Sequence, residues 1–336
     1  RSTFPPSHEN PMNKLKQTIA ILGLALCCAG PALAQDFPAK PVRIVVPYSA
    51  GGPVDALLRA MAPLLASEWK QPVLIENKTG ANEIIGADYV AKSQPDGYTL
   101  LAATEASLSM SQHLYRKLPF RPDRDLAPIS QLVTLPMAFI VPASSPAKTM
   151  KEFVALAAKS QAKPLSFGST GAGGITHLPM AMFEHNEAIK LLHVPYKGAA
   201  NLVPDIISGT VDAAVLAVTP IEQHVKAGTI KALAISAPTR AALLPGVPTF
   251  AEAGVKDIQA SFIIGLMAPA GTPAAVVEKI AAATRKILLA PEFRSKYADP
   301  FSYIVVGSSP SQFADFLVQD RRVQGERVKM SGVQLD

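Results

Sequence analysis

Two glycine-rich segments are the parts of this sequence best suited to hold a ligand. The first consists of Tyr48, Ser49, Ala50, Gly51 and Gly52, and the second includes Ser169, Thr170, Gly173, Gly174 and Thr176. Glycine lets a backbone approach a ligand closely, and the N–H groups and dipole of a following helix start attract anions. Each segment follows a β-type run and precedes a helical pattern. The pair therefore predicts an anion-binding site, although glycine-rich turns also occur in α/β proteins without a ligand.

Several side chains beside these segments have both a functional and a structural interpretation. Asp55 could face a ligand and select a hydrogen-bond donor, or it could bond the free N–H groups of a helix start. Tyr48 and Tyr196 adjoin predicted strand ends, where a phenol can pack or can donate a hydrogen bond to a ligand. His177 lies in a first helical turn after the second segment, so it is either a structural histidine or a ligand contact. The sequence leaves these alternatives open.

Motifs for catalysis or cofactor binding are missing from the sequence. Residues 168–174 have the spacing of a phosphate loop, but Ile175 and Thr176 follow where Lys and Ser/Thr are required. There is no G-x-S-x-G or H-E-x-x-H motif, and the histidines lack the i, i+4 spacing of a helical metal site. We expect a binding protein with no metal and no cofactor. An α/β enzyme acting on a small acid, with Asp55 or His177 as the base, is the alternative.

Short β-type runs alternate with amphipathic helical patterns from residue 41 onward, which predicts an α/β fold with mostly parallel sheets flanked by helices. Apolar residues recur every three or four positions from Val54 to Leu65, after Pro53, which suits a first helical position. Further helices are expected at 273–289 and 310–330. The predicted strands are 42–46, 73–75, 98–102, 165–167, 191–194, 213–216 and 232–235.

Two longer extended runs predict that the chain crosses between two lobes. Residues 129–141 lack a helical period and include Pro136, and residues 262–268 form a second apolar run. We expect lobe 1 to comprise residues 36–136 plus 262–336, and lobe 2 to comprise residues 137–261. The two glycine-rich segments then fall in different lobes, each at the carboxyl end of a strand, where open α/β sheets bind ligands.

The N-terminal region predicts secretion to the periplasm. Met12, two lysines, an apolar run and Ala32-Leu33-Ala34 have the order of a cleaved signal peptide over residues 12–34. Residues 1–11 precede Met12 and are expected to be upstream translated sequence or a cloning remnant. Both cysteines, Cys27 and Cys28, lie in the predicted peptide. Lipidation of one of them is the alternative, although a residue smaller than leucine normally precedes a lipidated cysteine.

The charge of the chain argues against a nucleic-acid partner. The formal net charge is +6, and removal of the first 34 residues takes away three cationic side chains and one anionic side chain, which leaves +4. These charges are dispersed, whereas nucleic-acid binding needs a clustered basic patch. The mild positive charge is compatible with a small anionic ligand.

The predicted mature chain resembles the Bug family, the substrate-binding proteins of tripartite tricarboxylate transporters. The similarity begins with F-P-A-K-P-V-R-I-V-V-P-Y-S-A-G-G-P-V-D at 37–55 and continues with P-D-G-Y-T-L at 95–100, H-V-P-Y-K-G at 193–198 and A-P-A-G-T-P at 268–273. It implies a type II periplasmic-binding-protein fold whose two lobes close like a flytrap. It also implies a small carboxylate ligand, held by backbone groups and waters from the two glycine-rich segments. The ligand would be delivered to membrane subunits or, in some members, sensed for a signalling partner; we expect a monomer.

Three segments differ from the Bug pattern and bear on the ligand. Residues 80–86 include Asn82 and Glu83 where family members are richer in glycine. Thr104 and Glu105 place a carboxylate where small or polar residues are usual. Leu216 lies in the apolar run 215–218, where many members are polar or acidic, and an apolar wall favours an aromatic or aliphatic acid, dicarboxylates included, over citrate. Thr104, Glu105 and Leu216 therefore join the expected ligand contacts.

Overall fold

A ten-stranded mixed sheet with helices packed against it is the centre of the computed structural model, which describes residues 37–258 and 260–335. The helices and strands described below all lie within the unit Lys40–Asp336. Residues 1–11 and the predicted signal peptide, with Cys27 and Cys28, lie outside the described residues. In the part of the chain that the structure describes, no helix is long and apolar enough to cross a membrane.

The sheet has the order β2-β1-β3-β9-β4-β7-β5-β6, with β8 and β10 also paired to β4. Its strands are β1 (Val42–Val46), β2 (Val73–Asn77), β3 (Thr99–Ala103), β4 (Leu126–Pro142), β5 (Ser166–Ser169), β6 (Leu192–Pro195), β7 (Ala213–Ala217), β8 (Ile230–Ser236), β9 (Ser261–Pro269) and β10 (Ile304–Val305). β1 lies between two parallel neighbours, β2 and β3, and β5 lies between two others, β6 and β7. We call these sets the β1 group and the β5 group. The strands expected from the sequence are confirmed, with ends shifted by a few residues.

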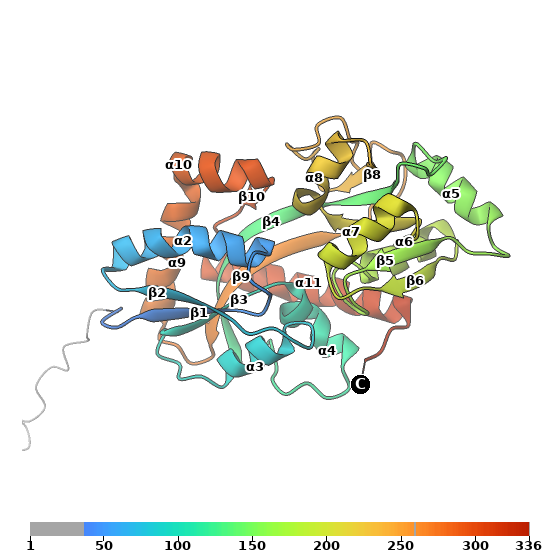
Figure 1. Ribbon diagram of the computed structural model, residues 1–336. Coiled ribbons are helices and arrows are strands. Elements are labelled where there is room, and N and C mark those ends of the chain that lie inside the picture. The colour runs from blue at the N-terminus through green and yellow to red at the C-terminus, as the bar shows by residue number, and fades with distance from the viewer. Residues whose placement is uncertain (1–36, 259, 336) are drawn as a thin grey trace, which may run out of the picture. The chain divides into compact units, whose positions relative to one another are not determined.

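β4 and β9 connect the two groups and are antiparallel partners of each other (Figure 1). Their pairing runs from Leu126 opposite Pro269 to Pro136 opposite Ser261. From Met137 onward, β4 pairs with β7 and β8 instead. The chain therefore passes from the β1 group to the β5 group along β4 and returns along β9, as the two extended runs predicted. The exact residue limits of the two lobes stay a prediction.

Helices cover both groups. They are α2 (Pro53–Trp69), α3 (Ile84–Ala91), α4 (Ser111–Leu114), α5 (Met150–Lys159), α6 (Leu178–Glu187), α7 (Ala199–Ser208), α8 (Val218–Lys226), α9 (Ala274–Leu289), α10 (Pro291–Phe293) and α11 (Pro310–Ser331). α2 has proline in its first turn and buries Leu57, Leu58 and Met61, which belong to the stripe seen in the sequence. α11 starts with a capping box formed by Ser309 and Gln312. The three helices expected from the sequence are thus confirmed.

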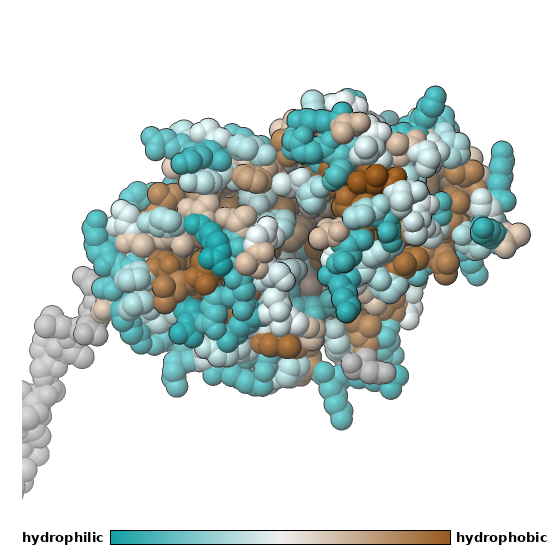
Figure 2. Space-filling view, in the orientation of Figure 1, coloured by the Kyte–Doolittle hydropathy of each residue, from teal (hydrophilic) through white to brown (hydrophobic). Residues whose placement is uncertain are grey.

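Separate hydrophobic cores hold the two groups. Val45, Leu101 and Phe313 are buried in the core of the β1 group. Ile140, Ile206 and other side chains of β4, β7, α7 and α8 are buried in a core of the β5 group. Burial of this apolar surface is the main stabilising contribution to such a fold. The face of the molecule shown in Figure 2 is mixed in hydropathy, with small hydrophobic patches separated by hydrophilic residues.

Candidate ligand-binding site

The two glycine-rich segments follow parallel strands of different groups. The first loop, residues 48–52, connects β1 to α2, and the second loop, residues 169–176, lies between β5 and α6. Thr104 follows β3, which is parallel to β1, so it lies at the same sheet edge as the first loop. Asn82 Nδ2 donates to the carbonyl oxygen of Ala172 at 3.3 Å and so joins the β1 side directly to the second loop. The structure therefore brings the surroundings of both loops together.

Asp55 holds the first loop in place. Its Oδ2 accepts from the Gly51 N–H at 2.9 Å and from Arg59 Nε at 2.8 Å, and its Oδ1 accepts from Asn77 Nδ2 at 2.9 Å. The same Asn77 nitrogen donates to the carbonyl oxygen of Tyr48. Burial alone would raise the pKa of Asp55, but the bonds from Arg59, Gly51 and Asn77 outweigh it and lower the pKa. These contacts match the structural interpretation of Asp55, while its contact with a ligand stays a prediction.

The first loop itself is open to solvent in part. Ser49, Ala50 and Gly51 are exposed, and Gly52 is half-buried. Gly51 has a φ of +86°, which is in the left-handed region that favours glycine. The loop conformation therefore depends on this glycine together with the bond to Asp55.

The second loop is closed by hydrogen bonds between its own residues. The Thr170 N–H donates to Thr176 Oγ1 at 2.8 Å, and the Gly173 N–H donates to His177 Nδ1 at 2.9 Å. The Gly174 N–H donates to the carbonyl oxygen of Gly171 at 3.2 Å. Several of the glycine-loop N–H groups that suggested an anion site are therefore engaged within the loop. Ordering of this kind fixes the loop before any ligand binds.

A stack of rings supports the second loop from β5 and β6. The rings of His177 and His193 are nearly parallel with centroids 3.8 Å apart, and Phe167 stacks on His193 at 4.9 Å. Ser169 Oγ lies 2.7 Å from His193 Nε2. Burial and, to a smaller extent, His193 lower the pKa of His177 to about 4. A neutral His177 is required here, because only an unprotonated Nδ1 can accept from Gly173.

Glu83 lies at the centre of a buried polar cluster that the sequence did not predict as a site. Its Oε1 accepts from the hydroxyls of Tyr48 and Thr104, and its Oε2 accepts from the Ser107 hydroxyl at 2.6 Å and the Thr104 N–H at 3.1 Å. Glu83 is 2% exposed, and Thr104 and Ser107 are fully buried. Burial raises the pKa of Glu83, although the bonds from Ser107, Thr104 and Tyr48 oppose this change. We call Glu83, Tyr48, Thr104 and Ser107 the Glu83 cluster.

Three other expected ligand contacts have partners within the fold. The Glu105 carboxylate accepts from the N–H of Ile263 at the start of β9, at 3.0 and 3.1 Å. The Tyr196 hydroxyl donates to Asp205 at 2.6 Å, and burial together with Asp205 raises the pKa of Tyr196 to about 12. Leu216 is 2% exposed in the core of the β5 group. This packing gives the expected apolar wall no support, and the ligand role of these three residues stays a prediction.

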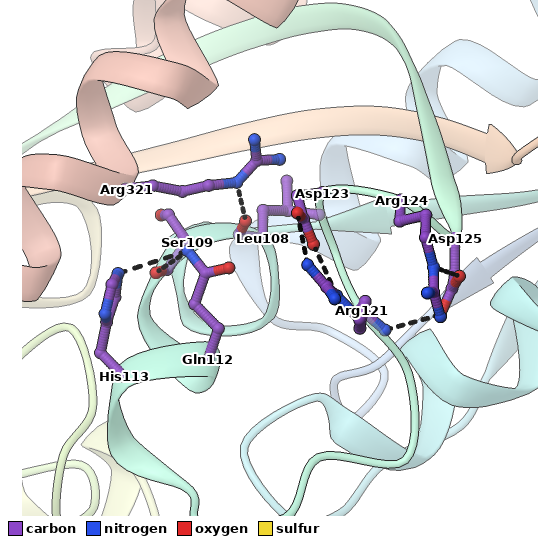
Figure 3. A network of polar contacts seen from close by, with 9 residues as sticks. All are labelled: Leu108, Ser109, Gln112, His113, Arg121, Asp123, Arg124, Asp125 and Arg321. Atoms are coloured by element: carbon purple, nitrogen blue, oxygen red, sulfur yellow. Dashed lines mark hydrogen bonds and ion pairs between the residues drawn. The ribbon is translucent and has the colours of Figure 1, made fainter.

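A second polar network lies before β4 and around α4, outside the two loops (Figure 3). Arg121 and Asp123 form an ion pair at 3.1 Å, with side chains that are 61% and 39% exposed. Arg321 of α11 donates to the carbonyl oxygen of Leu108 at 3.4 Å. Exposed ion pairs contribute little to stability. The Arg121–Asp123 pair is therefore surface structure, and Asp123 is a suitable control position.

A family model described as the tripartite tricarboxylate transporter family receptor matches residues 57–332. The chain belongs to this family. A known relative of the receptor, the UPF0065 protein in the tcbD-tcbE intergenic region of Pseudomonas sp. (strain P51), is 36% identical over 257 residues, which are 76% of each chain.

Solved structures agree with this family. The periplasmic binding protein BugD superposes on the receptor with a TM-score of 0.78 at 31% identity, over 89% of this chain and 99% of its own. The R. palustris protein Rpa4515, solved with adipate, gives a TM-score of 0.81 at 27% identity with the same coverage. The Bug resemblance and the two-lobed type II periplasmic-binding-protein fold predicted from the sequence are confirmed.

Other parts of the receptor offer less for ligand chemistry. A cavity of about 300 Å³ lies beside β4, β10 and α11, and its lining includes Thr134, Asp257 and Arg327 but none of the predicted site residues. Among residues 37–258 and 260–335, no group of three or more His, Cys, Asp or Glu side chains is arranged to hold a metal ion. The two loops and the Glu83 cluster therefore remain the candidate site.

Proposed function

We propose that this receptor captures a small organic carboxylate between the first and second loops and delivers it to the membrane subunits of a tripartite tricarboxylate-type transporter. The observation that carries the proposal is the family match over residues 57–332. A structural neighbour solved with adipate supports a carboxylate ligand. The position of both loops at the carboxyl ends of parallel strands, with Asn82 bonded to Ala172, supports a site between them.

The internal bonds of the loops favour this function. Asp55 and Asn77 fix the first loop, and Thr176 and His177 fix the second. A preorganised site loses less conformational freedom on binding, so more of the interaction energy appears as affinity. β4 and β9 are the connections along which the two groups could close as a hinge. In this proposal the membrane subunits recognise the closed, liganded receptor.

The proposal places the receptor in the periplasm as a monomer, reached through the signal peptide predicted at residues 12–34. The enzyme alternative receives less support, because both candidate bases are engaged in loop structure. Asp55 accepts from three donors, and His177 Nδ1 accepts from Gly173. A sensor would bind its ligand in the same way and differ only in its protein partner.

The test is a thermal-shift screen of the chain from residue 35 onward. A ligand that binds only the folded state adds about 2.7 kcal/mol of stability at a concentration of about 100 times its Kd. Adipate, malate, benzoate and citrate should be compared with the neutral amides of the same acids. We expect at least one carboxylate to raise the melting temperature while its amide does not. Equal shifts with acids and amides, or chemical conversion of the bound acid, would contradict the proposal.

A further inference from the structure

The hydrogen-bond donors of the Glu83 cluster are bonded to Glu83, so they are not free for a ligand carboxylate. Tyr48 and Thr104 are two of the residues expected to contact the ligand, yet both hydroxyls donate to Glu83. The Ser107 hydroxyl and the Thr104 N–H donate to the second carboxylate oxygen. A carboxylate has about four acceptor positions on its two oxygens, so these four donors fill them. The protein's own carboxylate therefore takes the place of an anion at this edge of the sheet.

The backbone of this segment is built to bring Glu83 inward. Ala81, Asn82 and Glu83 have φ values of 47°, 47° and 73°, so three consecutive residues with side chains adopt the left-handed region. Alanine and glutamate rarely adopt that region, and they stay in it where surrounding contacts hold them. The four bonds to Glu83 and the bond from Asn82 to Ala172 are such contacts. One turn thus brings Glu83 into contact with Tyr48 and brings the adjacent Asn82 into contact with the second loop.

The hydrogen bonds of the cluster have a defined direction. Tyr48 is the half-buried member of the cluster, and its hydroxyl proton is directed at Glu83, so its oxygen can act toward a ligand only as an acceptor. Burial raises the pKa of Glu83, while the four donors on its two oxygens favour the ionised form that carries a negative charge. A second carboxylate placed here would meet like charge and no free hydroxyl proton. An ammonium group, by contrast, would find an acceptor in the Tyr48 oxygen and an opposite charge behind it.

We propose that Glu83 is a specificity-determining residue that makes this receptor select monocarboxylates, preferably with an ammonium group at the other end, and reject dicarboxylates. The proposal rests on the proposed function and deepens it. It separates this receptor from its structural neighbour solved with adipate, a dicarboxylate. A like-charge pair about 5 Å apart at an effective dielectric constant of about 20 corresponds to a difference of about 100-fold or more in Kd.

The experiment uses matched ligand sets and isothermal titration calorimetry. Succinate, adipate and suberate are each compared with the monocarboxylate and the ω-amino acid of the same chain length. The wild-type receptor should bind the amino acid or monocarboxylate of one set at least about tenfold more tightly than its dicarboxylate. In Glu83→Gln this preference should shrink by about 100-fold or reverse. Asp123→Asn, which removes one exposed negative charge elsewhere, should leave the preference unchanged.

Glu83→Gly is the second variant, because glycine accepts a φ of 73° without strain. It should fold and show the same gain of dicarboxylate binding. Equal affinity of the wild-type receptor for a dicarboxylate and its matched monocarboxylate would overturn the role of Glu83 and leave the carboxylate function standing. If neither the wild type nor a folded variant binds any acid in the sets, the proposed function itself fails.

Discussion

Replacement of His177 by phenylalanine should remove a pH-dependent part of the stability of this receptor. His177 is 6% exposed, stacks on His193 and accepts a hydrogen bond from Gly173. Burial, followed by the nearby His193, lowers its pKa from 6.5 to about 4. Phenylalanine keeps the stacked ring but cannot bind a proton. The variant therefore isolates the titration of one side chain.

The size and sign of the effect follow from the two pKa values. Below about pH 6.5 the unfolded chain binds a proton at His177, whereas the folded receptor binds it only below about pH 4. The stability that neutral His177 contributes is thus complete above pH 6.5 and is lost as the pH falls toward 4. The interval between the two pKa values corresponds to about 3 kcal/mol of unfolding free energy.

Urea unfolding at a series of pH values from 7.5 to 4 measures this directly. The unfolding free energy of the wild type should fall by about 3 kcal/mol more than that of His177→Phe over this range. Titration of Glu83 and His193 contributes to both proteins and largely cancels in the difference. His185→Gln, which changes an exposed histidine of α6, should retain the wild-type profile. Parallel profiles for the wild type and His177→Phe would refute this account of the second loop.

Four further substitutions, with Gly246→Ala as a control, test the two loops and the packing of the fold. Asp55→Ala leaves three donors without their acceptor and should lower the unfolding free energy by about 3 kcal/mol in urea titrations; a wild-type value would contradict its anchoring role. Gly51→Val forces a branched side chain to a φ of 86° and should abolish acid binding in calorimetry while the far-UV circular dichroism stays near normal. Gly265→Ala puts a methyl group into the ring of Phe313 and should cost about 1–3 kcal/mol in thermal unfolding, whereas Gly246→Ala, with open space around it, should not. Tyr196→Phe loses a bond to a carboxylate and should cost about 2 kcal/mol in urea.

The sequence predicted the fold well because hydrophobic periodicity and turn residues are local signals. Val42 to Val46 and the stripe from Val54 to Leu65 became β1 and α2, and the two long extended runs became β4 and β9. The position of both glycine-rich loops at strand ends followed from the same alternation of strands and helices.

The details of the site depend on contacts between distant segments, and the sequence could not supply them. The role of Glu83 requires donors from residues 48, 104 and 107 and three left-handed residues in one turn. Asn82 and Glu83, in a segment where the Bug resemblance implies more glycine, were the only local signal of this arrangement. β7 pairs with β4 on one side and with β5 on the other, and this pairing decides which face of the sheet Leu216 occupies. The Leu216 side chain lies on the face that packs into the core.

Native mass spectrometry of the freshly purified receptor shows whether it holds an acid between its two loops. We expect a complex with one small organic acid, which is recovered unchanged on denaturation and whose loss lowers the melting temperature. Glu83→Gly should still carry an acid, and Gly51→Val should carry none. A receptor that never retains an acid, and that gains no mass from any carboxylate added in excess, would contradict the claim that the two loops form a carboxylate site.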